Sequence, residues 1–263
     1  MNFNKLLEIA INASIKGGHA IMKVYASDFS VEHKSDATPL TLADKNCHQI
    51  IEEQLKKTKI PILSEEGDQI VYSERKEWDY FWLVDPLDGT KEFIKRNGDF
   101  TVNIAMIYNQ KPIMGVIYVP EKKVLYFAMD GLGSYRTNRS SLIDNLQELI
   151  VESNKLPINY KRDNYVIVGS RSHMSTETEQ FIAEKKEKYG QIDFMAVGSS
   201  LKLCMVAEGK ADAYPRYAPT MEWDIGAGHA IVKMAGFSVY KYNTNQEVVY
   251  NKRDLLNPWF LVN

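Results

Sequence analysis

The stretch Trp82-Leu83-Val84-Asp85-Pro86-Leu87-Asp88-Gly89-Thr90-Lys91-Glu92-Phe93 carries the clearest chemical signal in this sequence. The apolar run that leads into it, residues 80–84, predicts a strand that is buried on both faces and stops at Asp85. Asp85 and Asp88 then place two carboxylates across a turn that a proline and a glycine favour. A functional site is therefore expected at the end of this strand.

A hard cation suits this arrangement. Mg²⁺ prefers near-octahedral oxygen ligation and keeps some of its waters, so two carboxylates and an outward carbonyl such as that of Leu87 leave room for a phosphate. Thr90 is expected to open a short helix whose N–H groups also favour an anion. By itself, an Asp-x-x-Asp spacing is more often a polar turn after a strand, so the prediction depends on what the rest of the chain supplies.

Three further acids stand at the beginning of a helix or the end of a strand. Asp44 lies in the first turn of a predicted helix, and Asp224 in the first turn of another, predicted over 222–235. In both places the helix dipole alone already favours a carboxylate. Glu65 follows a predicted strand over 60–63, and an acid in such a loop is commonly just solvated. Each acid taken singly has an ordinary structural explanation.

The motif over 82–93 resembles the metal-binding signature of the inositol monophosphatase superfamily, which are Mg²⁺-dependent, lithium-sensitive phosphomonoesterases. The Trp-Asp motif that contains Asp224 resembles the one that completes the second metal site in that superfamily. The resemblance also implies that Thr90, paired with Asp44, holds the attacking water without a covalent phosphoenzyme. It implies two or three Mg²⁺ ions in one site, with these ligands: Glu65, Asp85, the Leu87 carbonyl, Asp88 and Asp224.

Leu87 and the Lys-Glu-Phe tail resemble the bisphosphate nucleotidase branch of the superfamily. This resemblance implies that the second half of the chain selects the substrate. Ser170 and His173 would contact the nucleoside, although a lone histidine in a loop is usually an ordinary surface residue. The base, the ribose or the far phosphate would be held by Gly198, Lys202 and Arg216. Around the scissile phosphate the expected contacts are Glu65, Leu87, Asp88, Gly89, Thr90 and Asp224.

Arg216 separates the nucleotidase interpretation from its nearest rival. Inositol monophosphatases typically carry a glutamate at about this point, where it can accept hydrogen bonds from sugar hydroxyls. A guanidinium suits a second phosphate and cannot accept such bonds. Lys202 adds a positive charge at a helix start, which the helix dipole does not favour and an anion would. A solvated surface pair is the alternative for these two residues.

The hydrophobic pattern predicts an α/β protein with two lobes. Residues 1–140 are expected to form an α+β lobe that binds metal and contains an antiparallel meander of strands between 100 and 136. Residues 141–263 are expected to form an α/β lobe that binds substrate. Between them, 137–163 is predicted to be polar and irregular. With the resemblance, this implies the layered αβαβα sugar-phosphatase fold.

Composition narrows the possible partners. The chain has 263 residues, of which 25% are charged, and a net charge of −2, so a nucleic-acid backbone is not an expected ligand. Two cysteines without metal-ligand spacing suggest neither a disulfide scaffold nor a zinc site. No stretch approaches the ~20 apolar residues of a membrane span. A cytoplasmic protein is expected; peripheral attachment at the inner membrane stays open, as does the choice between monomer and homodimer.

The predicted reaction is that of a 3′(2′),5′-bisphosphate nucleotidase in sulfur assimilation: adenosine 3′,5′-bisphosphate and water give AMP and phosphate. Its sulfated form, 3′-phosphoadenosine 5′-phosphosulfate, stays open as a second substrate. One alternative is a sister phosphatase that acts on inositol 1-phosphate or fructose 1,6-bisphosphate. An alternative of another class is a non-catalytic nucleotide-binding protein, which fits poorly because every expected ligand side chain is in place.

Overall fold

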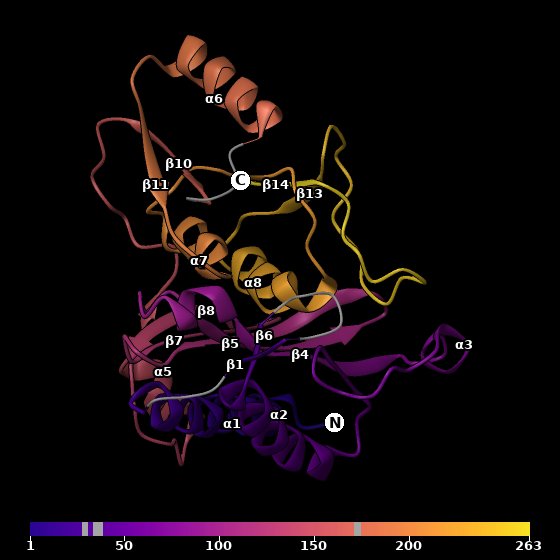
Figure 1. Cartoon of the computed structure of the whole chain (residues 1–263). Coiled ribbons are helices and arrows are strands. Elements are labelled where there is room, and N and C mark those ends of the chain that lie inside the picture. Colours follow the sequence, from indigo (N-terminus) through magenta and orange to yellow (C-terminus); the bar gives the residue numbers. More distant parts are fainter. Residues whose placement is uncertain (28–30, 34–38, 171–174) are drawn as a thin grey trace.

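The computed structural model describes residues 1–27, 31–33, 39–170 and 175–263. Its elements stack as helices, a large sheet, a second pair of helices, two small sheets and an outer helix (Figure 1). This is the predicted layered α/β architecture. Two extended apolar cores lie on the two faces of the large sheet, and a small third one lies under the outer helix.

The first layer packs α1 (Phe3–Tyr25) against α2 (Leu42–Leu55) on one face of the large sheet. Two adjacent glycines of α1 permit the close approach. A Cβ on Gly17 would lie 2.6 Å from the Cys47 sulfur of α2, and one on Gly18 would lie 2.5 Å from the Tyr118 ring of the sheet. Tight packing on both sides offsets the low helix propensity of this pair.

The large sheet contains seven strands, and its spatial order follows the chain: β3 (Ile62–Ser64), β4 (Tyr80–Asp88), β5 (Thr101–Tyr108), β6 (Lys111–Val119), β7 (Val124–Met129), β8 (Gly133–Asn138) and β9 (Asn154–Lys155). β3 pairs with β4 in parallel, and every later neighbour is antiparallel. The antiparallel meander from β5 to β8 confirms the sequence prediction.

β4 does not stop at Asp85 as predicted but continues to Asp88. Asp85 pairs with Asn103 and Asp88 pairs with Thr101 on β5, with an irregular register between the two pairs. The turn expected after Asp85 is thus absorbed into the ladder as a bulge, a feature that often re-aims side chains beside active sites.

The segment 137–163 is more regular than predicted. It contains α5 (Leu146–Val151), where the Asn145 side chain accepts hydrogen bonds from the backbone N–H groups of the first turn, and it contains β9. A capping asparagine followed by a short apolar patch was enough to form one and a half turns of helix. The large sheet therefore extends beyond residue 140, and the division into lobes at 140/141 stays a prediction.

The second half of the chain supplies the remaining layers. α7 (Leu201–Glu208) and α8 (Glu222–Met234) cover the other face of the large sheet. Above them lie a parallel pair, β10 (Tyr165–Gly169) with β11 (Ile192–Ala196), and a sheet of order β12-β14-β13 (Tyr214–Arg216, Phe260–Val262, Val239–Lys241). The outer helix is α6 (Thr176–Tyr189). The smaller elements are β1 (Val31–His33), β2 (Pro39–Thr41), a 3₁₀ turn (Lys56–Thr58), α3 (Tyr72–Arg75) and α4 (Thr90–Ile94).

β12 places Arg216 inside a strand. Its residues Tyr214–Arg216 pair with β14, whereas Ala213, just before it, makes an isolated bridge to Ile167.

α8 lies directly against the large sheet because its first turns carry small residues. A Cβ on Gly226 would lie 2.8 Å from the Leu83 side chain of β4. The first turn of α8, with Asp224, is thereby brought to the end of β4, where the two aspartates of the motif lie. No helix within the described ranges is long and apolar enough to cross a membrane.

Candidate active site

The two aspartates of the motif lie where β4 ends. Asp85 is 1% exposed, and its Oδ1 accepts a hydrogen bond from the Leu87 backbone N–H at 3.1 Å. This Asx turn bends the chain inside the bulge. Gly89 follows with φ of 90°, and a Cβ there would lie 3.1 Å from the Asp99 carbonyl oxygen. The sequence therefore needs glycine here both for its conformation and for space.

Carboxylates from three elements converge on Asp85. One oxygen of Glu65, which follows β3, one of Asp85 and one of Asp224 lie within 4.8 Å of one another. Burial raises the pKa of Asp85 well above its usual value, and the charges of Glu65, Asp88, Asp224 and Asp44 raise it further. Burial, and then Asp88, also raise the pKa of Asp224. The cluster holds ionised carboxylates only at a high cost unless a cation joins it.

The donor set of this cluster fits Mg²⁺. It consists of carboxylate oxygens, the ligands that this hard cation prefers. Asp224 Oδ2 accepts from the Met221 backbone N–H at 2.8 Å, which fixes the carboxylate and leaves Oδ1 for a cation. The Leu87 carbonyl oxygen accepts from the Thr90 hydroxyl at 3.3 Å and has a second lone pair. Glu65, Asp85, Asp88, Asp224 and the Leu87 carbonyl could therefore hold the metal.

Asp44 and Thr90 lie close together, as the resemblance implied. Asp44 is 2% exposed and projects from the first turn of α2, while Thr90 opens α4. The distance from Thr90 Oγ1 to Asp44 Oδ2 is 3.4 Å. With its single hydrogen directed at Asp44 or at the Leu87 carbonyl, the Thr90 oxygen keeps lone pairs for a water molecule.

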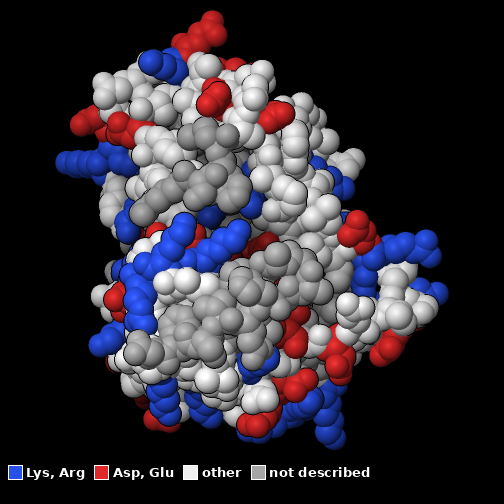
Figure 2. Space-filling view, viewed as in Figure 1, with Lys and Arg blue, Asp and Glu red and all other residues white. Residues whose placement is uncertain are grey.

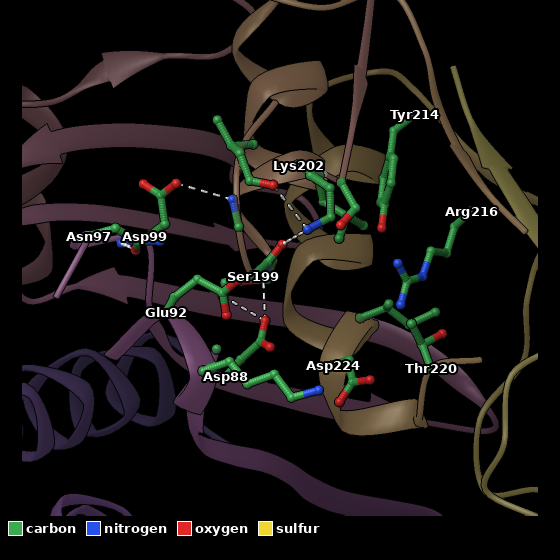
Figure 3. A pocket seen from close by; sticks show the side chains of 18 of the residues that line it. Asp88, Glu92, Asn97, Asp99, Ser199, Lys202, Tyr214, Arg216, Thr220 and Asp224 are labelled. Atoms are coloured by element: carbon green, nitrogen blue, oxygen red, sulfur yellow. Dashed lines mark hydrogen bonds between the residues drawn. The ribbon is translucent and has the colours of Figure 1, made fainter. Parts of the chain in front are cut away.

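A cavity of about 330 Å³ opens beside the cluster, between the large sheet and the second half of the chain (Figure 3). Its volume is within the range of about 300–1,000 Å³ that is usual for small-molecule sites. Seven residues proposed from the sequence line it: Asp88, Gly89, Ser170, Gly198, Lys202, Arg216 and Asp224. Glu65, Leu87 and Thr90 are not part of its wall, and His173 lies outside the described residues.

Lys202 is buried at the start of α7, with 7% of the residue exposed. Its ammonium donates to the Ser199 carbonyl at 2.6 Å and to the Val197 carbonyl at 3.4 Å. Burial lowers the pKa of Lys202 to about 8; Asp88 opposes this shift, and Arg216 adds to it. Two of its three hydrogens are thus used on the backbone turn that precedes α7, and one remains available to a ligand.

Arg216 lies on β12 and points into the same cavity, toward Asp224 and Thr220 (Figure 3). Its Nη2 donates to the Pro219 carbonyl at 3.1 Å, while its buried Nε–H has no hydrogen-bond partner among the described residues. Its positive charge acts on both Asp224 and Lys202. A guanidinium held in this way can meet an anion inside the cavity.

Charged residues of α4 and of its end also line the cavity. They are two lysines, Lys91 and Lys95, and one acid, Glu92. Figure 2 shows Lys and Arg side chains gathered along the cleft that crosses this face of the molecule. The cavity therefore contains both carboxylates and cationic side chains. This combination suits a polyanion, provided that a metal ion neutralises the part of the polyanion that lies beside the carboxylates.

Sequence reasoning missed Ser199 and Ser200 as site residues. Both the Ser199 hydroxyl and the Ser200 backbone N–H donate to Asp88 Oδ2, each at 2.6 Å. It also missed Asp99 and Thr101, which contact the same turn. The available signal was the alternation of polar residues at 99, 101 and 103 along an otherwise apolar strand, because such positions share one face of the sheet.

The comparisons with known proteins agree over nearly the whole chain. The sequence matches the inositol monophosphatase family over residues 2–259. The 3′(2′),5′-bisphosphate nucleotidase CysQ of Salmonella typhimurium is 40% identical over 261 residues, which cover 98% of this chain and 99% of that one. CysQ of Escherichia coli K12 is 38% identical over 263 residues, covering 98% of each chain.

The structure is also similar to that of a CysQ protein. The crystal structure of CysQ from Bacteroides thetaiotaomicron, described as a bacterial member of the inositol monophosphatase family, superposes with a TM-score of 0.92 at 49% identity, covering 99% of this chain and 97% of that one. An inositol monophosphatase from Thermotoga maritima shares the fold at a TM-score of 0.75 and 21% identity, covering 98% and 91% of the two chains. This chain therefore belongs to the inositol monophosphatase family.

Proposed function

We propose that the protein is a Mg²⁺-dependent 3′(2′),5′-bisphosphate nucleotidase that hydrolyses adenosine 3′,5′-bisphosphate to AMP and phosphate. The observation that carries the proposal is the cavity itself. It joins the carboxylates Asp88 and Asp224 to the cations Lys202 and Arg216 within one small-molecule-sized space. A substrate with two phosphates on opposite sides of one ribose matches a site with a metal-binding end and a cationic end.

The scissile phosphate would lie at the acidic end. Mg²⁺, when bound there, would neutralise the phosphoryl group and lower the pKa of a coordinated water. Thr90 Oγ1 would accept a hydrogen bond from the attacking water, because its own hydrogen is directed at Asp44 or the Leu87 carbonyl. The water oxygen would bond to phosphorus as the water gives up a proton, the bond from phosphorus to the ribose oxygen would break, and that oxygen would take up a proton, so that one proton is released and one is gained.

The second phosphate would lie at the basic end. Arg216 offers a buried Nε–H without a partner among the described residues, and Lys202 has one hydrogen left after its two backbone contacts. Hydrogen bonds between such cations and a phosphate are short and about twice as strong as neutral ones. The relatives that are 38% to 40% identical carry the name bisphosphate nucleotidase, which supports the same substrate class.

The test is phosphate release in the presence of Mg²⁺, measured in parallel on four substrates: adenosine 3′,5′-bisphosphate, 3′-phosphoadenosine 5′-phosphosulfate, inositol 1-phosphate and fructose 1,6-bisphosphate. We expect the adenosine bisphosphate to have the highest kcat/KM, and the sulfated form shows whether the 5′ group must be a plain phosphate. Preference for inositol 1-phosphate would overturn the substrate assignment while keeping the metal site. If the protein hydrolyses none of the four substrates but binds the nucleotide tightly, it is a nucleotide-binding member of the family.

A further inference from the structure

A polar stripe on β5 lies beside the acidic end of β4. Asp99, just before β5, and Thr101 and Asn103 within it occupy alternate positions, so their side chains share one face of the sheet. In the ladder, Thr101 stands opposite Asp88 and Asn103 opposite Asp85. These three polar residues are at most 5% exposed. A buried polar stripe in an apolar strand needs partners, and here it finds them in the second half of the chain.

The partners lie in the turn Gly198-Ser199-Ser200, which precedes α7. Asp99 Oδ2 accepts from the Gly198 N–H at 3.2 Å, and its Oδ1 accepts from the Lys122 ammonium at 2.7 Å. Thr101 Oγ1 lies 2.5 Å from Ser199 Oγ and 2.8 Å from Ser200 Oγ. Lys202 binds the carbonyl side of the same turn. The turn is therefore held from both sides.

The hydrogens of these hydroxyls have a definite order. Ser199 donates its one hydrogen to Asp88 Oδ2 at 2.6 Å, so at the Thr101 contact Ser199 must be the acceptor and Thr101 the donor. Thr101 has then no hydrogen left for Ser200, whose own hydrogen faces the oxygens of Thr101 and Asn103, both at 2.8 Å. The hydrogen bonds thus form a series from Thr101 through Ser199 to Asp88, and each hydrogen bond polarises the next.

The backbone of the turn 198–200 is strained, and the hydrogen bonds of Ser199 hold it in this conformation. Ser199 has φ of 53°, a left-handed conformation that few residues other than glycine adopt. A Cβ on Gly198 would lie 2.8 Å from Glu92 Cγ and 3.0 Å from the carbonyl oxygen of Asp99, so the backbone approaches the first half of the chain as closely as possible. Such strain persists where surrounding contacts hold it, often at functional sites.

We infer that Thr101 is a positioning residue, which acts through the Ser199 hydroxyl to fix the carboxylate of Asp88 for metal binding. Asp88 Oδ2 receives both donors of the turn, and within the described part of the chain no hydrogen bond reaches its Oδ1, which is left for a cation. Thr101 itself does not line the cavity. The inference rests on the proposed function only in taking Asp88 as a metal ligand.

The test measures Mg²⁺ binding by calorimetry on the protein without substrate, so it does not depend on which substrate is right. Thr101→Val removes the hydroxyl at nearly constant volume, and Thr101→Ser keeps it. Loss of a hydrogen-bond partner behind a metal ligand typically costs about 10- to 100-fold in metal affinity or activity. We expect an increase of this size in the Mg²⁺ dissociation constant for Thr101→Val and less than about a twofold change for Thr101→Ser.

A second variant keeps the test decisive if Thr101→Val folds poorly. Ser199→Gly removes the middle hydroxyl and relaxes the left-handed backbone, so it should preserve folding while weakening Mg²⁺ binding. Because Thr101 acts through Ser199, the double variant should bind Mg²⁺ no more weakly than Ser199→Gly alone. Unchanged Mg²⁺ affinity of Ser199→Gly would overturn the inference without the Thr101 variant. Additive losses, or a Thr101→Val protein with a lowered Tm and unchanged Mg²⁺ affinity, would show a purely structural role and overturn it as well.

Discussion

Ser199 Oγ donates a hydrogen bond of 2.6 Å to Asp88 Oδ2, although 111 residues separate the two in the chain. The bond joins the turn before α7 to the end of β4, and so connects the half of the chain that carries Lys202 and Arg216 to the half that carries the motif. The groups that we propose to bind substrate and metal are thereby connected by a direct hydrogen bond.

Asp88→Asn should abolish turnover while leaving the protein folded. The amide lacks the charge that a cation needs, and loss of a ligand should exceed the about 10- to 100-fold cost of losing a partner behind it. Phosphate release and the Tm, measured together, check both halves of the prediction. Asp130→Asn, at an exposed aspartate after β7, is the matched control and should behave as wild type. Near-full activity of Asp88→Asn would contradict the proposed role of Asp88 as a metal ligand.

Arg216→Gln should weaken the bisphosphate nucleotide much more than inositol 1-phosphate. A charge-assisted hydrogen bond contributes about 1.5–3 kcal/mol, or roughly 10- to 100-fold in KM. The test uses Arg216→Gln and not Arg216→Glu, because an added carboxylate beside Asp224 would disturb the metal site as well. Lys111→Gln, at an exposed lysine that begins β6, controls for a general loss of positive charge. Equal losses on both substrates would argue against a phosphate at this position.

Asp85→Asn should make the metal-free protein more stable and remove its response to Mg²⁺. Asp85 is surrounded by Glu65, Asp88, Asp224 and Asp44, and this crowding together with burial raises its pKa. Removing its charge relieves the repulsion, but it also removes a ligand. The Tm in a chelator and in excess Mg²⁺ is the measurement. For the wild type, Mg²⁺ at a hundredfold excess over its Kd should contribute about 2.7 kcal/mol; an unchanged Tm would count against a metal site here.

Gly198→Ala should lower both stability and activity. The new Cβ would lie 2.8 Å from Glu92 Cγ and 3.0 Å from the Asp99 carbonyl, so the turn must move away from Asp88. Overpacking of this kind costs typically about 1–3 kcal/mol. Gly131→Ala is the comparison, because a Cβ there meets no atom within 4 Å and only the φ of 76° is strained. The Tm should fall in both variants, and the Mg²⁺ affinity only in Gly198→Ala.

Acidification should destabilise the fold through His229 and Glu247. His229 is fully buried in α8, 2.9 Å from the Tyr250 hydroxyl, and burial lowers its pKa below 6.5. The neighbouring His229 imidazole, with Lys233, lowers the pKa of Glu247 to about 2. In both cases the unfolded chain takes up a proton at a higher pH than the folded protein does. The free energy of unfolding should therefore fall below pH 6.5, and again as the pH drops from 4.5 toward 2.

His229→Gln tests the part of the histidine in the pH dependence. Glutamine can still accept a hydrogen bond from Tyr250 but does not titrate, so the loss of stability that begins below pH 6.5 should flatten. The loss below pH 4.5 should shrink, because of the two groups that lower the pKa of Glu247 only Lys233 remains. Denaturant unfolding across this pH range is the measurement. Parallel profiles for wild type and variant would mean that His229 does not titrate in the way its burial indicates.

Much of the site was accessible from the sequence because its signals are local. The strand before Asp85, the turn residues and the helix starts at Asp44 and Asp224 each follow from patterns a few residues long. What the local pattern misjudged was the end of β4, since the pairing of Asp88 with Thr101 depends on a neighbouring strand. The helix α5 was missed for a related reason: its apolar face is short, and packing against α1 supplies part of its stability.

By itself, the sequence determined which chemical groups this protein has: carboxylates at the end of a buried strand and at two helix starts, a lysine and an arginine in the second half, and a family resemblance that orders them. Only the tertiary structure decided which of these groups meet. It directed the Lys202 ammonium at the carbonyls of the turn before α7, left the buried Arg216 Nε–H without a hydrogen-bond partner among the described residues, and placed Thr101 and Ser199 behind Asp88. The physical reason is that the register of a ladder and the close approach of a glycine turn are set by packing between segments far apart in the chain, which no short window of sequence contains.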